Sequence, residues 1–137
     1  KLALDDGIAA SAEERLTFIH RHKTGALFRA SLRLGALAGG LTGEALERVT
    51  KYAIHFGTAF QITDDLLDIE GEPDHIGKAV GSDARKQKLT YPSLYGIEKS
   101  RAMAEKEVEG ALQALEPFGI KGDFLKAAAR FVLRRDR

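Results

Sequence analysis

Three aspartates near the middle of the chain, Asp64, Asp65 and Asp68, are spaced as side chains that share one face of a helix. At roughly 100° per residue they fall, with Gln61, within one narrow arc. Like charges one turn apart destabilise a helix, and the negative C-terminal end of the helix dipole adds to that cost. Bound Mg²⁺, which prefers carboxylate oxygens, would offset both effects. A solvated acidic face is an equally good interpretation of the three acids alone.

Three lysines near predicted breaks between helices suggest what such a cation would hold. Lys23, Lys78 and Lys88 could neutralise the diphosphate oxygens that Mg²⁺ does not reach. Each lysine taken alone is more often a solvated surface residue. Taken with the acids, they favour a site for a diphosphate bound through Mg²⁺.

The elements that must position these residues are all predicted to be helices. Residues 11–14 have capping-box spacing and predict a helix start, and the periodic pattern is interrupted at residues 23–26. A second helix should end at Gly39-Gly40, and a long central one should run from Thr42 to about Glu70. Buried stripes are predicted at Leu46, Val49, Ala53, Phe56, Phe60 and Leu67, at Ala104, Val108, Ala111, Leu112 and Leu115, and at Phe124, Leu125, Ala128, Phe131 and Val132.

The stretch from Gly71 to Leu89 has no periodicity and directly follows the acidic face. Long segments of this kind inside a domain are usually functional or disordered, and the position of this one favours function. Pro92 should open a helix that Gly96 weakens or ends, and Pro117 with Gly119 should end the next one.

The composition is that of a soluble globular protein and predicts one helical domain over residues 1–137. With 44% hydrophobic residues, 30% charged residues and a net charge of +1, the chain has no overall field that would attract nucleic acid or a membrane surface. No segment approaches the ~18 apolar residues of a membrane span, so we expect no stable membrane insertion. The absence of cysteine excludes disulfides and Cys-ligated metals, and it is compatible with the cytoplasm, where we expect the protein.

Four blocks of the sequence resemble the C-terminal part of the trans-type isoprenyl diphosphate synthases, the family that includes farnesyl and geranylgeranyl diphosphate synthases. They are Lys23-Thr24-Gly25-Ala26-Leu27, Phe60-Gln61-Ile62-Thr63-Asp64-Asp65-Leu66-Leu67-Asp68, Gly77-Lys78, and Asp83 through Lys88 to Thr90-Tyr91-Pro92. Four ordered blocks with the right separations are much rarer by chance than a single D-D-x-x-D. The resemblance implies an all-α antiparallel helical bundle, of which this chain would supply the later part.

The resemblance also implies a metal site. Asp64, Asp65 and Asp68 would form the second of the family's two aspartate-rich motifs and bind Mg²⁺, with Asp64 the most direct ligand. The first motif is not found, because no acid follows Asp5-Asp6-Gly7 at the required spacing. We therefore expect these 137 residues alone to be inactive or nearly so.

Substrate contacts are implied in the same way. Lys23, Thr24 and Gln61 match positions that contact the allylic substrate, and Lys78 and Lys88 match lysines that approach its diphosphate. Lys23, Asp64 and Lys78 are the residues implied to be catalytic. Asp83 matches a further motif position, where it could equally orient one of these lysines.

The implied reaction condenses an allylic diphosphate with isopentenyl diphosphate to give a longer isoprenyl diphosphate. Mg²⁺ and lysines would stabilise the departing diphosphate, and the isopentenyl double bond would attack the allylic cation. The family resemblance implies a homodimer, and an apolar face left exposed by a missing half of the bundle would favour one too. Two alternatives stay open: a non-catalytic helical subunit or partner of a prenyl diphosphate synthase, and a terpene cyclase, which the Lys23-Thr24 and Gly77-Lys78 blocks fit poorly.

The remaining polar residues give no competing site. The histidines, which are His20, His22, His55 and His75, lack H-E-x-x-H spacing, and each is expected at the surface. The acids do not alternate as in a calcium loop. Arg29, Arg33 and the terminal arginines, Arg134, Arg135 and Arg137, are expected to face solvent.

Overall fold

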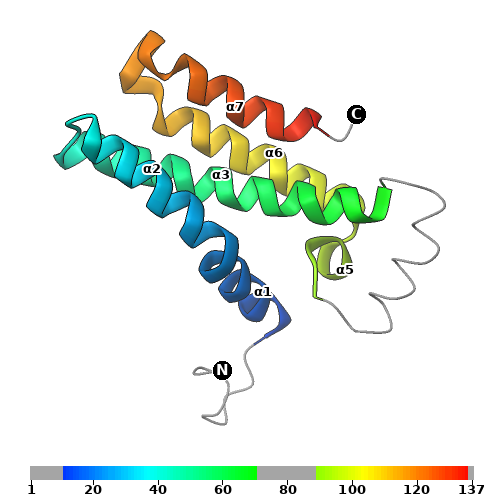
Figure 1. The fold of residues 1–137 in the computed structure, drawn as a ribbon. Helices are drawn as coiled ribbons and strands as arrows, with labels where there is room; N and C mark the ends of the chain where they lie inside the picture. Colours follow the sequence, from blue (N-terminus) through cyan, green and yellow to red (C-terminus); the bar gives the residue numbers. More distant parts are fainter. Residues whose placement is uncertain (1–10, 71–88, 136–137) are drawn as a thin grey trace, which may run out of the picture.

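The computed structural model describes residues 11–70 and 89–135, and every regular element in these ranges is a helix (Figure 1). In chain order the elements are α1 (Ala12–His20), the π-helical turn η1 (Arg21–Gly25), α2 (Ala26–Ala38), α3 (Gly43–Glu70), α5 (Tyr91–Tyr95), α6 (Ile97–Ala114), the 3₁₀ segment η2 (Glu116–Gly122) and α7 (Asp123–Arg134). The predicted all-α class is confirmed. Apart from Leu89, the predicted loop after α3 lies outside the described residues.

Local capping signals set helix ends where the sequence predicts them. Ser11 Oγ accepts a hydrogen bond from the Glu14 N–H at 3.1 Å, and Glu14 Oε2 accepts one from the Ser11 N–H at 2.7 Å. Gly39 and Gly40 end α2, and Gly40 has a φ of 87°, which glycine adopts without steric cost. These contacts are short-range, which is why they can be inferred from spacing alone.

The α-helical pattern is interrupted close to the predicted residues 23–26, where the π turn η1 separates α1 from α2, although the helical backbone continues through it. Gly25 has a φ of −60° and a ψ of −38°, which are right-handed helical values. A Cβ built on Gly57 of α3 would lie 3.4 Å from the Cα of Gly25, at van der Waals contact, whereas one built on Gly25 would lie 3.2 Å from the His20 carbonyl oxygen of its own turn. The two glycines therefore allow the π turn and α3 to approach closely.

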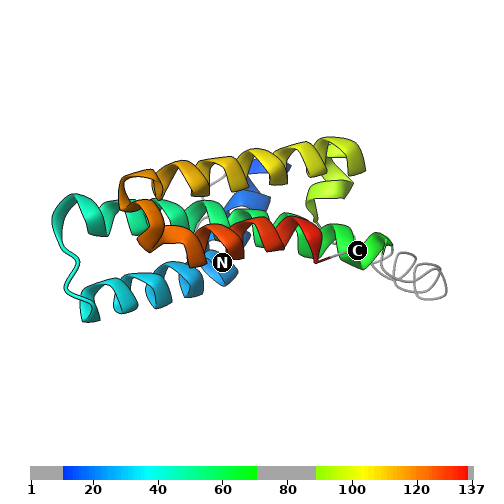
Figure 2. The same cartoon turned by 90° about the horizontal axis from the view of Figure 1, so that it is seen from above.

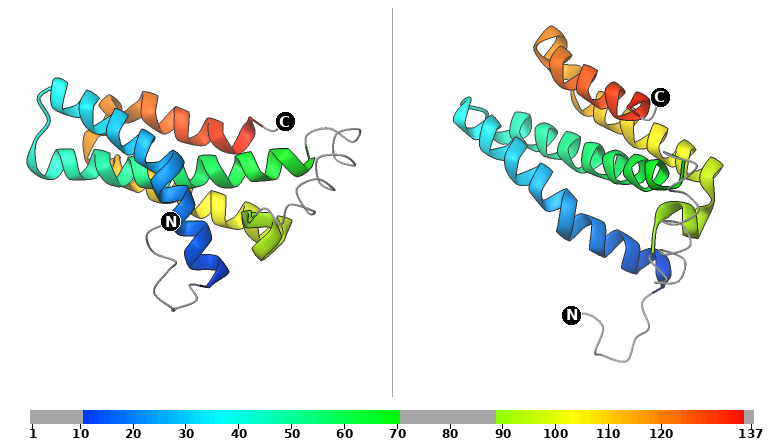
Figure 3. Two further views of the ribbon diagram at one scale, coloured as in Figure 1. Left: turned by 60° about the horizontal axis from the view of Figure 1, so that its bottom comes forward. Right: turned by 45° about the vertical axis from the view of Figure 1, so that its right-hand side comes forward.

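Helix α3 is central, with α2 along one side and α6 along the other (Figure 3). Helix α7 packs against both α3 and α6 (Figure 2). Ala59 of α3 and Ala111 of α6 are fully buried, and such small side chains let neighbouring helices lie close together. Helix α3 is thus held by neighbours on several sides before it reaches the aspartates at its C-terminal end.

The core consists of two clusters along α3. One joins Tyr52, Ala59, Val108, Ala111, Ala114, Leu115, Ala129 and Val132, and the other joins Leu16, Ile62, Leu66, Tyr91 and Ala104. Burying each large aliphatic side chain contributes roughly 1.5–3 kcal/mol. The stripe predicted around α6 is buried except at Leu112, which is half-buried, whereas in α3 the predicted stripe is buried at Val49 and Ala53 and half-buried elsewhere.

Large apolar side chains remain exposed on several of the described helices, including α2 and α7. On α2 they are Leu27, Leu34 and Leu37. On α7, Phe124 is 82% exposed and Phe131 is 59% exposed, so their predicted burial is wrong. Val132 is buried as predicted, together with Ala129, because the buried arc of α7 is centred on these two residues and not on the two phenylalanines.

Candidate active site

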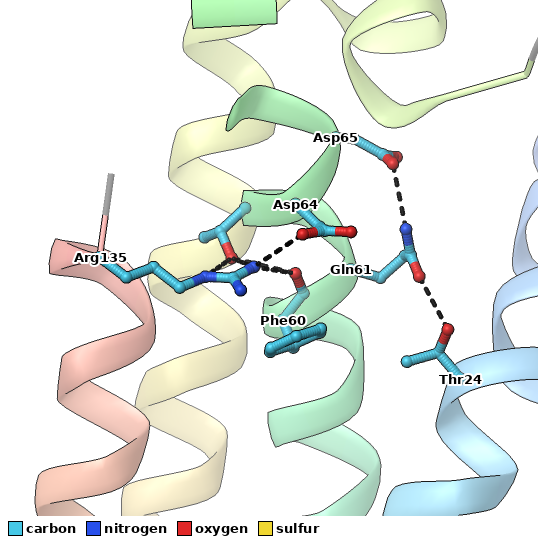
Figure 4. Close-up of polar contacts among 7 residues, drawn as sticks. Thr24, Phe60, Gln61, Asp64, Asp65 and Arg135 are labelled. Atoms are coloured by element: carbon cyan, nitrogen blue, oxygen red, sulfur yellow. Dashed lines mark hydrogen bonds and ion pairs between the residues drawn. The ribbon is translucent and has the colours of Figure 1, made fainter. Parts of the chain in front are cut away.

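The three aspartates lie on the last turns of α3. Asp64 and Asp65 have different surroundings (Figure 4). Asp65 is buried, with 5% of its surface exposed. The side chain of Asp64 is 50% exposed, and Asp68 lies in an exposed position. Asp64 therefore presents its carboxylate to solvent, whereas Asp65 presents its carboxylate to the protein interior.

Asp65 accepts two hydrogen bonds from its own chain. Gln61 Nε2 donates to Asp65 Oδ1 at 3.1 Å, and the backbone N–H of Tyr91 donates to Asp65 Oδ2 at 3.1 Å. Thr24 Oγ1 donates to Gln61 Oε1 at 3.0 Å and extends the chain of bonds to the π turn (Figure 4). Burial raises the pKa of Asp65; the bonds from Tyr91 and Gln61 oppose the rise, and the nearby carboxylates of Asp68 and Asp64 add to it.

Asp64 faces the other way, towards Arg135 at the end of α7. Arg135 Nη2 lies 3.6 Å from Asp64 Oδ1, and the arginine side chain is only 16% exposed. The guanidinium also donates to the Phe60 carbonyl oxygen at 2.8 Å and to Thr63 Oγ1 at 2.7 Å, and it lies 4.0 Å from the centre of the Phe60 ring. The prediction that Arg135 faces solvent is wrong, because the docking of α7 brings its end to these acceptors. Arg134 is exposed as predicted, and Arg137 lies outside the described residues.

The carboxylates do not converge into a complete metal cage. Within residues 11–70 and 89–135, no group of three His, Cys, Asp or Glu side chains is placed to hold a metal ion. Mg²⁺, however, commonly takes one or two protein carboxylates and completes its shell with water and phosphate oxygens. Asp64 and Asp68, which lie one turn apart with exposed side chains, fit this manner of binding. Both oxygens of Asp65 already accept N–H donors.

The π turn carries the other predicted residues of the site. Lys23 is exposed and Thr24 is half-buried, so the lysine ammonium is available to a ligand while the threonine is fixed against α3. The structure therefore brings Thr24 and Gln61 together with Asp65, and presents Lys23 from the neighbouring position. Lys78, Lys88 and Asp83 lie outside the described residues.

Two histidines predicted to lie at the surface are held by tertiary contacts. His20 packs against the Tyr91 ring at 5.2 Å, and its Nδ1 is buried with no hydrogen-bond partner among the described residues. Burial, followed by the charge of Lys23, lowers the pKa of His20 to about 4. His55 Nδ1 lies 2.7 Å from Glu107 Oε2 across the α3–α6 contact. His22 is exposed, as predicted, and His75 lies outside the described residues.

A cavity of about 310 Å³ opens beside His20 and Tyr91. Its lining also includes Thr17, Thr58 and Glu107, but none of the residues predicted from the sequence to bind metal or substrate. The predicted chemistry therefore lies around the aspartates at the end of α3 and outside this cavity.

Sequence reasoning missed two partners of the aspartates. Arg135 and the N–H of Tyr91 reach α3 only through the docking of α7 and α5, and no spacing in the sequence pairs either one with an aspartate. Tyr91 stands in one of the four blocks that carry the family resemblance, and this was the only signal available for it.

Comparison with known proteins identifies the family of the chain. A family model described as polyprenyl synthetase matches residues 3–118. The chain belongs to the polyprenyl synthetase family. The resemblance to the trans-type isoprenyl diphosphate synthases is thereby confirmed.

Individual polyprenyl synthetases show how much of the family fold the chain covers. It is 46% identical over 120 residues to a dimethylallyltranstransferase of Fischerella ambigua, a match that covers 88% of this chain and 35% of that protein. It is 41% identical over 128 residues to the farnesyl diphosphate synthase of Escherichia coli, covering 90% of this chain and 43% of the relative. The crystal structure of an FPP/GFPP synthase from Zymomonas mobilis superposes with a TM-score of 0.73 at 34% identity, over 93% of this chain and 40% of that one. The chain thus spans less than half the length of these polyprenyl synthetases.

The comparisons do not determine the cellular compartment of the protein. The described part of the chain contains no helix with the length and apolar character that a bilayer span requires. The relatives include a chloroplastic geranylgeranyl pyrophosphate synthase of Catharanthus roseus, 42% identical over 132 residues. The family therefore does not fix a compartment, and the cytoplasmic location stays a prediction.

Proposed function

We propose that the intact protein is a Mg²⁺-dependent prenyltransferase that condenses an allylic diphosphate with isopentenyl diphosphate to make a longer isoprenyl diphosphate. The main support is the hydrogen-bonded arrangement that joins Thr24, Gln61 and the aspartate motif in a polyprenyl synthetase. The exposed apolar side chains of α2 and α7 support assembly with further helices, and we propose a homodimer in the cytoplasm as the working state.

The residues of the chain would act by holding charge. Asp64 and Asp68 would hold the cation, and the ammonium of Lys23 would bind a diphosphate oxygen, as would Lys78 and Lys88 from outside the described residues. Asp65 belongs to the same acidic motif. Bound Mg²⁺ would supply the positive charge that stabilises the departing diphosphate.

The bond changes place specific demands on the protein. The allylic carbon–oxygen bond breaks, the isopentenyl double bond forms the new carbon–carbon bond, and a proton is lost to the released diphosphate. The intermediate charge must be shielded from water while this happens. Phe60 and Phe56 lie one and two turns before Asp64 on α3 and stack at 6.5 Å, which gives apolar surface beside the acidic end. No protein nucleophile is required.

The test is elongation by the intact protein. With Mg²⁺ and an allylic diphosphate, it should incorporate labelled isopentenyl diphosphate, chelation by EDTA should abolish this, and residues 1–137 alone should be inactive. Asp64→Asn should lower kcat/KM at least about a hundredfold, whereas Glu105→Gln, which removes an exposed acid of α6, should not change it.

Other outcomes would redirect the assignment. A folded intact protein that binds diphosphate but never elongates would favour the non-catalytic partner. Cyclisation of an allylic diphosphate without isopentenyl diphosphate would favour the terpene cyclase.

A further inference from the structure

Both carboxylate oxygens of Asp65 accept hydrogen bonds from other residues of the chain. One oxygen accepts from Gln61 one turn back on α3, and the other accepts from the N–H of Tyr91, 26 residues further along the chain. Through Gln61 the bonds continue to Thr24 in the π turn. A single buried carboxylate thus joins three separate elements, namely η1, α3 and α5.

The direction of these bonds is fixed by chemistry. An ionised carboxylate can only accept, so Gln61 must present its NH₂ group to Asp65 and its carbonyl oxygen to Thr24. The threonine hydroxyl must then donate, and this is the arrangement observed. With Asp65 ionised, turning the Gln61 amide over would place its carbonyl oxygen against the carboxylate, so that two acceptors would face each other.

We propose that Asp65 is a positioning residue and not a direct metal ligand: it holds Thr24, Gln61 and the first residue of α5 in register with Asp64. This inference rests on the proposed function in one respect, which is that Thr24 and Gln61 are substrate contacts. The burial of Asp65 supports it, because a metal ligand must offer an oxygen to the ion and its waters.

The first test reverses the polarity of the bonds in the intact protein. Gln61→Glu would place two carboxylates 3.1 Å apart and should lower the Tm by about 5 °C or more. In the double variant Gln61→Glu with Asp65→Asn, the new asparagine NH₂ can donate to the glutamate, which also accepts from Thr24. The Tm should return to within about 2 °C of the parent value.

A matched control separates this pairing from a simple loss of charge. Gln61→Glu combined with Asp68→Asn has the same net charge but leaves Asp65 ionised, so the Tm should stay low. Amide hydrogen exchange at Tyr91 gives a second readout: it should speed up at least about tenfold in Gln61→Glu and recover only in the Asp65→Asn double variant. Equal rescue by both double variants, or by neither, would overturn the proposal.

The second test measures metal binding without turnover. Mn²⁺ affinity in the presence of inorganic pyrophosphate is followed by electron paramagnetic resonance. Asp64→Asn should weaken binding at least about tenfold, and Asp65→Asn by less than about threefold, because asparagine preserves the bonds when the Gln61 amide turns over. Equal weakening by both variants would make Asp65 a ligand and overturn the inference. If neither variant weakens binding while the polarity swap rescues stability, the metal site of the proposed function fails and the positioning role stands.

Discussion

Asp64 and Asp65 are neighbours with identical side chains, yet they belong to different parts of the molecule. Asp65 points into the protein, where Gln61 and the Tyr91 N–H take both of its oxygens. Asp64 points outward, half exposed, with the Arg135 guanidinium 3.6 Å away. The difference shows that neighbouring residues of one acidic motif on a helix can have different surroundings, one held by hydrogen bonds in the interior and the other half exposed.

The largest effect that would test this contrast is on stability. Asp65→Ala should lower the free energy of unfolding by about 2–4 kcal/mol, because the Tyr91 N–H and the Gln61 amide lose their acceptor in a buried place. Asp64→Ala should lower it by less than about 1 kcal/mol, since its ion pair is half exposed. Urea denaturation of both variants measures the difference. Similar losses at the two positions would remove the contrast.

A smaller loss of stability is expected beside Asp64, where Arg135 contacts α3. Arg135→Ala should cost about 1.5–3 kcal/mol, since the guanidinium donates to both Phe60 and Thr63 from a mostly buried position. Arg134→Ala, on the exposed position next to it, is the matched control and should change stability by less than about 0.5 kcal/mol. Thermal unfolding reports both. If the control loses as much as Arg135→Ala, the contacts of Arg135 are not what holds α7 to α3.

A pH-dependent effect on stability is expected beside Asp65, at His20, which packs against the Tyr91 ring. The pKa of His20 is about 4 in the folded protein and 6.5 for the free side chain, so the unfolded state binds more protons between these values. The contribution of His20 to stability is therefore fully present above pH 6.5 and is lost as the pH falls towards 4. In His20→Gln, which does not titrate, unfolding curves measured between pH 7.5 and pH 4.5 should show a weaker decline. Parallel declines for the variant and the parent would contradict the assignment.

The sequence predicts much of the helical framework because helix ends are local events. The capping box at Ser11, the glycines after α2 and the proline–glycine pair that ends α6 need only a few neighbouring residues, and all three are confirmed. The aspartate spacing also follows from helix geometry, but the shared arc predicted from it does not give shared surroundings, because Asp65 is buried against Gln61 and Tyr91 whereas Asp64 is half exposed beside Arg135. The interruption predicted at residues 23–26 takes the form of a π turn, in which Gly25 keeps helical φ and ψ values and does not end a helix.

The parts that could not be predicted depend on how helices dock. In α7 the two phenylalanines and the small Ala129 give more than one plausible apolar face, and only contact with α3 and α6 selects among them. The same docking turns Arg135 from an expected surface charge into a partner of Phe60 and Thr63. The hydrogen bond from the Tyr91 N–H to Asp65 could not be predicted either, because the two residues are 26 positions apart in the sequence.

The π turn makes the length of the Arg21–Gly25 segment as important as its composition. A π turn holds one residue more than the α-helix on either side of it. Excising a single residue would leave a regular helix but would swing everything before it by about 100° around the axis. Leu16, now buried against Ile62 and Leu66, would turn towards water, so this short stretch should tolerate exchanges of side chain far better than a change in its number of residues.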